Sequence, residues 1–486
     1  MQHTLPITKE SILHTHFQKF LIGITVLAFV VRLVNSTYAS LWSDELYSML
    51  SVHPDNSFYE MLLLQRRDQP PLYFVLLRLW VDVFGHTDFS ARMLSIIIGS
   101  ASVFAIGWVN NKIYNFRVGL LSAFLVAFNF TQIEYSLEVR FYGLVFLLVV
   151  ISMYTYYLCK KNNATWFVHI LHGGVCAMII LSHHFGAFVV LVYGLFDVAD
   201  LIRTKFQFEK LKKKFVAYSF TLLLIVPWFY WSLTSIKTVQ NYWLKIIDLG
   251  GYLLFNLNYN IVALVLILLV AGFGLFRSGF KQNNMNLVLL FQIVMVTIIP
   301  LIFSYVKFPI LVSRYSFSLA PALYTLIAIG FIEVLALLKN YKVVAVSIVC
   351  ILLSADGLYH SFINRTPLLK EPWKEMAAWL KSQSGYQNKA IYTVGFMVND
   401  RVSIDYYLPE KKVTHILWDS SNLRKHDQFF LVETNAHDRI ADDFRRSLDS
   451  NFSKEEVLFG VKDYGKGGVI TIYKPLPVKQ VATEIK

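Results

Sequence analysis

The sequence has few of the residues on which soluble enzymes and disulfide-linked domains depend. Only 16% of its 486 residues are charged, whereas a soluble domain has about 25%. Its three cysteines lie in or beside apolar stretches, without the spacing of a zinc site or a disulfide framework. It also lacks a phosphate-binding glycine loop and a dinucleotide fingerprint. These absences argue against a soluble nucleotide-dependent enzyme, a zinc module and a disulfide-rich domain.

Apolar residues make up most of the chain, but they are unevenly distributed. Hydrophobic residues account for 56% of the sequence, and its mean hydropathy is +0.50. Of the 45 basic and 32 acidic residues, 19 and 16 lie in the 125 residues from Phe362 onward, leaving 26 and 16 for the first 361. We therefore predict a domain solvated by lipid over residues 1–361 and a domain solvated by water over residues 362–486.

Eleven apolar runs have about the length needed to cross a bilayer, for which about 20 helical residues suffice. A twelfth segment, residues 71–84, is shorter, contains Arg78 and Asp82 and begins with two prolines, so it predicts an amphipathic helix at the membrane interface. The predicted spans are residues 20–37, 93–109, 118–134, 141–158, 166–182, 185–202, 215–233, 259–276, 287–304, 316–338 and 343–361.

The basic residues fix the predicted orientation of these spans. If residues 71–84 do not cross and the N-terminus is cytoplasmic, the inner segments hold sixteen Lys and Arg and only two acidic residues. Short cytoplasmic loops have such a basic excess. The formal net charge of +13 is therefore a signal of topology, and we expect no nucleic-acid partner. The C-terminal domain then lies outside the cytoplasm, and its short β-type runs between helix-like stretches predict a small α/β fold.

In this topology the unusual polar residues fall at the outer ends of the spans. Asp44 and Glu45 follow the first span, and adjacent carboxylates at a membrane surface are costly unless they meet a cation, a metal or a reacting group. Their alternative is a solvated loop with interfacial aromatic residues. Further clusters follow later spans: Glu138, Arg140 and Tyr142; His183 and His184; Lys307 and Arg314.

These side chains suit the transfer of a sugar from a lipid phosphate. An acceptor hydroxyl that attacks the anomeric carbon needs a carboxylate to take its proton, and the departing phosphate needs cations. We expect Asp44 to be the base and Arg140, Arg314 and Lys307 to hold the phosphate. Glu138, Tyr142, His183 and His184 are candidates for substrate binding. A local Glu–Arg pair, a structural His pair and snorkelling basic residues are the alternatives.

The motifs resemble those of the GT-C membrane glycosyltransferases that use polyprenyl-phosphate sugars, in the branch of protein O-mannosyltransferases and the lipid A aminoarabinose transferase. The resemblance extends in order and spacing from Leu41 to Pro321. It rests on five short motifs: Asp44-Glu45, Gln69-Pro70-Pro71-Leu72-Tyr73, Phe84-Gly85 with Ala91-Arg92, Tyr135-Ser136 to Tyr142, and Arg314-Tyr315 to Pro321.

The resemblance implies an all-α polytopic fold with about eleven transmembrane helices and juxtamembrane helices in the first outer loop. It also implies an acidic pair in which Asp44 is the catalytic base, with Glu45 beside it, and donor-phosphate binding by Arg140. Gln69 departs from the His that many relatives have at this position. Some relatives bind a divalent metal near the first loop, and Glu45, His183 and His184 are candidate ligands here, so a metal remains open.

We therefore expect an inverting glycosyltransferase that takes its sugar from a polyprenyl phosphate, in a bacterial inner membrane. The acceptor remains open among lipid, glycan and protein. Two other functions remain open: a transporter of lipid or polyprenyl-phosphate sugar, in which the cations bind phosphate but no base is needed, and a membrane anchor that presents the C-terminal domain to a protein partner.

Overall fold

The chain forms two compact units, which are described separately. The first comprises Met1–Ser36 and Ser51–Ile363, and the second comprises Thr37–Leu50 and Asn364–Lys486. In this computed structural model the described residues are 16–37, 39–65, 69–205, 208–233, 249–257, 285–337, 354–363, 372–394, 399–411, 413–416, 429–434, 452–459 and 470–475, with a few isolated positions at 265, 269, 272–273, 276–277 and 352.

The second unit differs from the predicted C-terminal domain by one segment. The sequence assigned residues 37–50 to the membrane domain, whereas the structure groups Thr37–Leu50 with the residues from Asn364 onward. The reason is a set of hydrogen bonds that join this segment to the C-terminal part of the chain, among them the bond from Leu41 N–H to Tyr407 Oη at 2.9 Å. Contacts between residues so distant in sequence are invisible to an analysis of local pattern.

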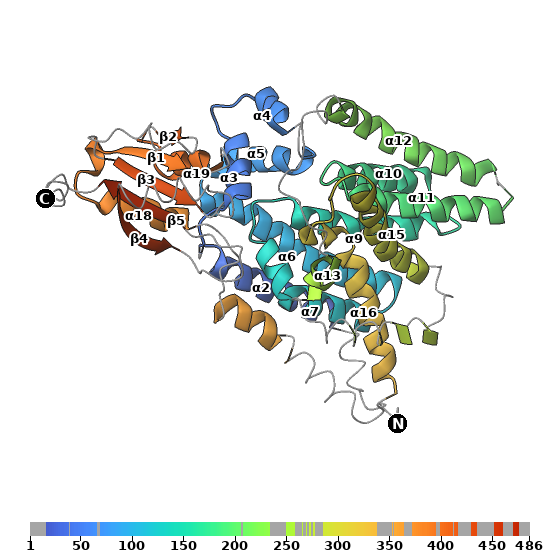
Figure 1. Cartoon of the computed structure of the whole chain (residues 1–486). Coiled ribbons are helices and arrows are strands. Elements are labelled where there is room, and N and C mark those ends of the chain that lie inside the picture. Colours follow the sequence, from blue (N-terminus) through green and yellow to red (C-terminus); the bar gives the residue numbers. More distant parts are fainter. Residues whose placement is uncertain are drawn as a thin grey trace, which may run out of the picture. The chain divides into compact units, whose positions relative to one another are not determined.

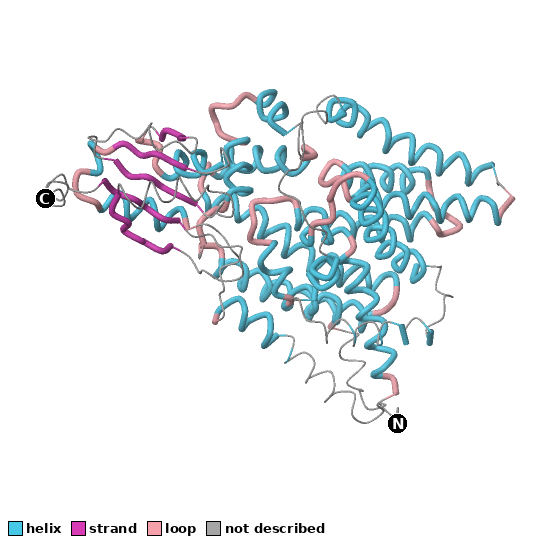
Figure 2. The backbone as a smooth tube through the Cα atoms, in the orientation of Figure 1, coloured by secondary structure: helices cyan, strands magenta, loops and turns pink. Residues whose placement is uncertain are grey.

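The first unit is helical (Figures 1 and 2). Its helices α9, α10 and α15 contain no Asp, Glu, Lys or Arg, as is typical of lipid-solvated helices. Its described helices are α2 (Phe17–Asn35), α4 (Phe58–Gln65), α5 (Leu72–Phe84), α6 (Asp88–Ile113), α7 (Phe116–Phe128), α8 (Phe130–Tyr135), α9 (Tyr142–Cys159), α10 (Trp166–Ile180), α11 (Gly186–Arg203), α12 (Phe208–Leu233), α13 (Leu249–Leu254), α15 (Met285–Val306) and α16 (Ala320–Leu335), with 3-10 turns η2 (Phe255–Leu257) and η3 (Ser313–Ser318).

Nine of the eleven predicted spans fall on described helices, and the runs 259–276 and 343–361 lie largely outside the described residues. Among the helices that the structure describes, five are long and apolar enough to cross a membrane: α2, α6, α9, residues 211–232 of α12, and α15. Helices α7, α10 and α16 are apolar but shorter. The chain is thus a multi-helix membrane protein, and the count of eleven spans stays a prediction.

Helix α6 lies at the centre of the first unit and packs against α2, α7 and α9. Glycines let α6 and α7 approach closely, since a Cβ on Gly119 would lie 2.5 Å from the carbonyl oxygen of Gly107. Small residues at helix interfaces serve the same purpose in membrane proteins generally, because lipid supplies no hydrophobic force between helices. The core of the unit is therefore held by close backbone contact.

The predicted interfacial segment forms the amphipathic helix α5. Tyr73, Phe74 and Leu77 are buried, whereas Leu79 and Val83 on the other face are exposed apolar side chains. At the start of the helix, the Leu72 N–H donates to the carbonyl oxygen of Leu181 at 2.9 Å. This bond joins the helix to the loop between α10 and α11.

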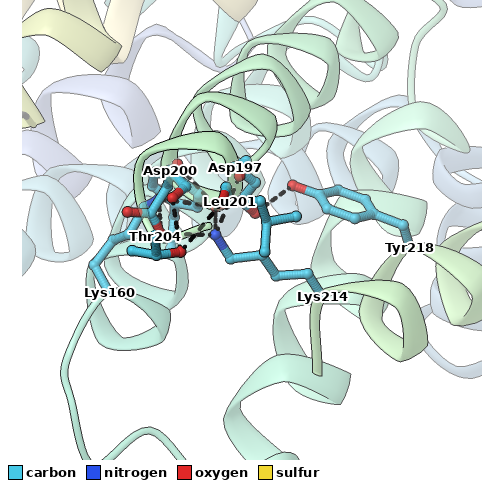
Figure 3. A network of polar contacts seen from close by, with 8 residues as sticks. Lys160, Asp197, Asp200, Leu201, Thr204, Lys214 and Tyr218 are labelled. Carbon is cyan, nitrogen blue, oxygen red and sulfur yellow. Dashed lines mark hydrogen bonds and ion pairs between the residues drawn. The ribbon is translucent and has the colours of Figure 1, made fainter. Parts of the chain in front are cut away.

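A charge-balanced network links the ends of α9, α11 and α12 (Figure 3). Asp197 Oδ1 lies 2.8 Å from Lys160 Nζ and 3.0 Å from Lys214 Nζ. Lys214 also pairs with Asp200 at 2.9 Å, and Tyr218 Oη donates to the other oxygen of Asp197 at 2.9 Å. Two lysines thus face two carboxylates, so the cluster buries charged groups with partners for each.

The second unit contains a five-stranded sheet, drawn in magenta in Figure 2, with the order β2-β1-β3-β5-β4. Strand β1 pairs in parallel with β2 and β3, and β5 pairs antiparallel with β3 and β4. Trp373 and Leu380 of α18 and Ile404 of α19 are completely buried. The elements are α3 (Ser43–Ser51), α18 (Trp373–Ser382), η5 (Tyr386–Asn388), β1 (Ala390–Val394), α19 (Asn399–Tyr407), β2 (Val413–Ile416), β3 (Phe429–Thr434), β4 (Phe452–Phe459) and β5 (Ile470–Pro475).

Candidate active site

Three loops that the sequence singled out meet in the first unit. Arg140 comes from the loop between α8 and α9, and its guanidinium carbon lies 5.2 Å from the ring centre of Phe141. The Phe141 ring stacks on the imidazole of His183, from the loop between α10 and α11, at 4.7 Å. His183 in turn contacts Tyr315 of η3 at 4.5 Å, next to Arg314. Residues separated by about 170 positions are therefore gathered around one histidine.

His183 is the neutral centre of this group. Burial lowers the pKa of His183 well below its usual range, and the adjacent His184 and the charges of Arg140 and Arg314 lower it further. The Phe185 N–H donates to His183 Nδ1 at 3.2 Å, so Nδ1 is an acceptor and the ring proton belongs on Nε2. A neutral histidine between two arginines is a hydrogen-bond donor that adds no further positive charge.

The remaining predicted residues of these loops differ in their exposure. Glu138, Arg140 and Tyr142 are buried, at 3%, 5% and 1% exposure. Arg314 is half-buried, and His184 is exposed. The structure thus places both arginines in the same neighbourhood and makes Arg314 the more accessible of the two.

Aromatic side chains pack beneath the loops. The Tyr142 ring lies 5.1 Å from Tyr135 and 5.6 Å from Phe317, and Phe255 contacts both Tyr135 and Phe317. Such edge-to-face packing stabilises an aromatic cluster beyond its buried area. The ring of Tyr142 therefore belongs to the support of the loop.

Lys307 is the most exposed of the three predicted phosphate-binding cations. It is exposed directly after α15, and its N–H bonds to the carbonyl of Phe303 as the helix ends. Its predicted role in holding phosphate stays a prediction.

Arg32, which no sequence motif singled out, binds the start of the Arg140 loop. Arg32 is in α2 and only 1% exposed. Its Nε donates to Ser136 Oγ at 2.7 Å, and its Nη atoms donate to carbonyls at the end of α7, those of Val126 and Ala127, at 3.2 Å. The last carbonyls of a helix lack partners within it, so Arg32 caps α7 while fixing Ser136. An arginine inside a predicted span was the available signal.

Asn256 of η2 joins the Arg140 loop to the Arg314 turn. Its Nδ2 donates to Ser316 Oγ at 2.8 Å, and its Oδ1 accepts from Gln132 Nε2 at 3.3 Å. Its backbone oxygen accepts from Asn129 and from Tyr324. Because α8 precedes Arg140 and η3 contains Arg314, this asparagine sets the spacing of the two segments. No motif in the sequence indicated this function.

Asp44 and Glu45 belong to the second unit, at the start of α3, and have different environments. Glu45 is completely buried, and its Oε2 accepts a hydrogen bond from the Trp42 N–H at 3.2 Å. This reach back to the residue before the helix is the Glu half of a capping box. Asp44 is half-buried. The structure therefore gives Glu45 a structural contact and leaves Asp44 as the more accessible carboxylate.

The candidate metal ligands belong to different units, Glu45 to the second and His183 and His184 to the first. No group of three or more His, Cys, Asp or Glu side chains suited to a metal ion occurs among the described residues. The rings of His183 and His184 are 6.4 Å apart and tilted, and Glu45 is engaged with the Trp42 N–H. The part of the chain that the structure describes therefore offers no cluster of ligands for a divalent metal.

Comparison with known proteins gives one family match and several matches of fold. Residues 68–231 match the family model described as dolichyl-phosphate-mannose-protein mannosyltransferase. No curated protein has a significantly similar sequence. The structure of ArnT from Cupriavidus metallidurans bound to undecaprenyl phosphate matches with a TM-score of 0.59 at 11% identity, covering 95% of this chain and 98% of ArnT.

A second solved structure extends this likeness. AglB from Archaeoglobus fulgidus, an archaeal oligosaccharyltransferase in complex with an inhibitory peptide and a dolichol-phosphate, matches with a TM-score of 0.53 at 11% identity. The match covers 96% of this chain and 75% of AglB. Together with the family match over residues 68–231, these structures confirm the resemblance indicated by the sequence motifs: the chain has the GT-C fold of membrane glycosyltransferases that use polyprenyl-phosphate-linked sugars.

Proposed function

We propose that this protein is an inverting glycosyltransferase that moves a sugar from a polyprenyl phosphate to an acceptor hydroxyl at the outer face of the cytoplasmic membrane. The observation that carries the proposal is the convergence of Arg140 and Arg314 on the neutral His183. Two guanidinium groups and one imidazole N–H form a donor set suited to a phosphate that gains charge as the sugar departs.

In the proposed reaction, the acceptor oxygen forms a bond to the anomeric carbon while the bond from that carbon to the phosphate oxygen breaks. The electrons of the broken bond remain on the polyprenyl phosphate, where Arg140 and Arg314 stabilise them. The acceptor proton passes to the Asp44 carboxylate. The configuration at the anomeric carbon inverts because the nucleophile attacks on the side opposite the leaving group. Hydroxyl groups of a lipid, a glycan or a protein can all serve as the acceptor in this reaction.

Two variants test the proposal in purified full-length protein. Asp44→Asn should abolish transfer, because the side-chain amide cannot accept the proton of the acceptor. Undecaprenyl phosphate should still bind, because Arg140 is intact. Arg140→Ala should weaken the binding of undecaprenyl phosphate by tenfold or more, the range of one charge-assisted hydrogen bond. Undiminished transfer by Asp44→Asn would show that this mechanism is wrong.

The same experiment separates the enzyme from a transporter of polyprenyl-phosphate sugars. A transporter needs the arginines but no base, so Asp44→Asn would keep flux across a vesicle membrane and Arg140→Ala would lose it. Mass spectrometry of the lipid-linked sugars that accumulate when the protein is removed would identify the donor sugar.

A further inference from the structure

The segment that carries Asp44 is fixed by the C-terminal part of the chain. Ser40 and Leu41 are 3% and 0% exposed, and both bond to residues more than 300 positions away. Ser40 Oγ donates to Glu375 Oε2 at 2.9 Å, and Tyr407 Oη accepts from the Leu41 N–H at 2.9 Å. Two helices, α18 and α19, therefore hold two consecutive residues.

Ser40 also completes one of these helices. The Lys374 N–H donates to Ser40 Oγ at 3.0 Å, and Lys374 is the second residue of α18, where backbone N–H groups lack partners within the helix. No side chain of the helix's own N-cap, Pro372, supplies such a bond. Segment and helix thus stabilise each other, since Ser40 caps α18 while Glu375 of the same turn holds Ser40.

The fixed residues lead directly into the helix of Asp44. The Leu46 N–H bonds to the Trp42 carbonyl at 2.9 Å, the Trp42 N–H bonds to Glu45 Oε2, and Ser48 Oγ donates to the Asp44 carbonyl at 3.1 Å. The fixed position of Leu41 therefore also fixes the first turn of α3, because hydrogen bonds join Trp42, the next residue, to that turn. Catalytic groups need placement to within about 0.5 Å.

We propose that, within the second unit, Tyr407 and Glu375 are positioning residues for the base Asp44. This inference rests on the proposed function. The domain acts through the backbone of residues 40–42: Tyr407 and Glu375 touch neither donor nor acceptor, and they set where the Asp44 carboxylate stands when the acceptor proton leaves.

The test uses Tyr407→Phe, which removes one hydroxyl and leaves the ring, in the full-length protein. The matched control is Tyr386→Phe, which removes the same atom from the same unit, where Tyr386 Oη donates to Glu410 at 2.8 Å. Hydrogen exchange of the Leu41 amide should be at least tenfold faster in Tyr407→Phe than in the control. The release of undecaprenyl phosphate from lipid-linked sugars extracted from source membranes should fall about tenfold in kcat, with KM for the donor within twofold.

A second pair makes the result independent of the tyrosine. Glu375→Gln keeps an oxygen that accepts from Ser40 and should retain activity, whereas Glu375→Ala should lose kcat as Tyr407→Phe does. If Tyr407→Phe and Glu375→Ala behave like the control, or raise KM as much as they lower kcat, the positioning inference is overturned. Asp44→Asn, measured in parallel, distinguishes failure of the positioning inference from failure of the proposed function. If Asp44→Asn is inactive, the proposed function stands; if it is fully active, the proposed function is refuted.

Discussion

Arg32 Nε donates a hydrogen bond of 2.7 Å to Ser136 Oγ across 104 residues of sequence. The bond joins α2 to the loop that carries Arg140, and the same guanidinium binds the carbonyls at the end of α7. One buried cation thus serves both a helix end and a candidate site.

Arg32→Met should destabilise the protein by roughly 2–3 kcal/mol, because it leaves several buried carbonyls and one hydroxyl without their donor. Binding of undecaprenyl phosphate should weaken with it, since the Arg140 loop loses its support. Thermal unfolding in detergent and a binding assay measure the two effects. Arg32→Lys is the control: it keeps the charge but has no fork of donors, and it should recover only part of the loss. Full stability of Arg32→Met would contradict this role.

Gly99 provides a steric test of the packing around Ser136, the residue that Arg32 binds. A Cβ on Gly99 of α6 would overlap the side chain of Ser136, whereas a Cβ on Gly194 of α11 would meet nothing within 4 Å. Gly99→Ala should therefore cost about 1–3 kcal/mol through overpacking, while Gly194→Ala should gain up to about 1 kcal/mol from helix propensity. Opposite signs in the change of unfolding temperature are expected. A shift of the same sign in both would argue against close contact at Ser136.

His183 makes stability depend on pH. Its pKa in the folded protein is well below its usual range, so between about pH 6.5 and that lower value the unfolded chain binds a proton that the folded chain does not. Stability should therefore fall as pH is lowered from 7 to 5. His183→Asn cannot titrate, and its unfolding temperature should fall less over this interval. Parallel curves for the two proteins would mean that other groups cause the loss.

The network in Figure 3 gives a matched pair of lysines in α12. Lys214 contacts Asp197 and Asp200 with only 10% of its side chain exposed, whereas Lys212 is 46% exposed and lies 3.6 Å from Glu209. Lys214→Met should destabilise the protein by about 3–5 kcal/mol, since it leaves buried carboxylates with one cation. Lys212→Met should change stability by less than about 1 kcal/mol. Unfolding in detergent compares the two, and equal effects would refute the difference in burial.

Substitutions of Glu45 should affect stability, whereas substitution of Asp44 should affect sugar transfer. Glu45→Gln keeps an oxygen for the Trp42 N–H and should retain stability and most activity, whereas Glu45→Ala should lose about 1 kcal/mol, as lost caps do. Asp44→Asn should lose transfer with little change in stability. Circular dichroism with heating and an assay for released undecaprenyl phosphate measure both. If Glu45→Gln lost transfer while keeping full stability, Glu45 would have a catalytic role as well as a structural one.

The sequence predicted most of the membrane helices because each is a single apolar run, bounded by charged residues or turns. It also predicted which loops meet, since the positive-inside rule put the loops of Arg140, His183 and Arg314 on one face. It could not predict what holds them, because the hydrogen bonds of Arg32 and Asn256 depend on tertiary approach. Nor could it separate Asp44 from Glu45, since both are adjacent acidic residues and the pattern does not show that the Glu45 carboxylate accepts from the Trp42 N–H.

The hydrogen bond between Ser40 and Glu375 spans 335 residues of chain, and this has a consequence for biogenesis. The ribosome makes the segment of Asp44 near the beginning of the chain and its partners near the end, so the segment is complete well before α18 and α19 exist. Contacts of such long range form late and slow folding. Asp44 would then acquire its position only when synthesis is nearly finished, after most of the first unit has been made.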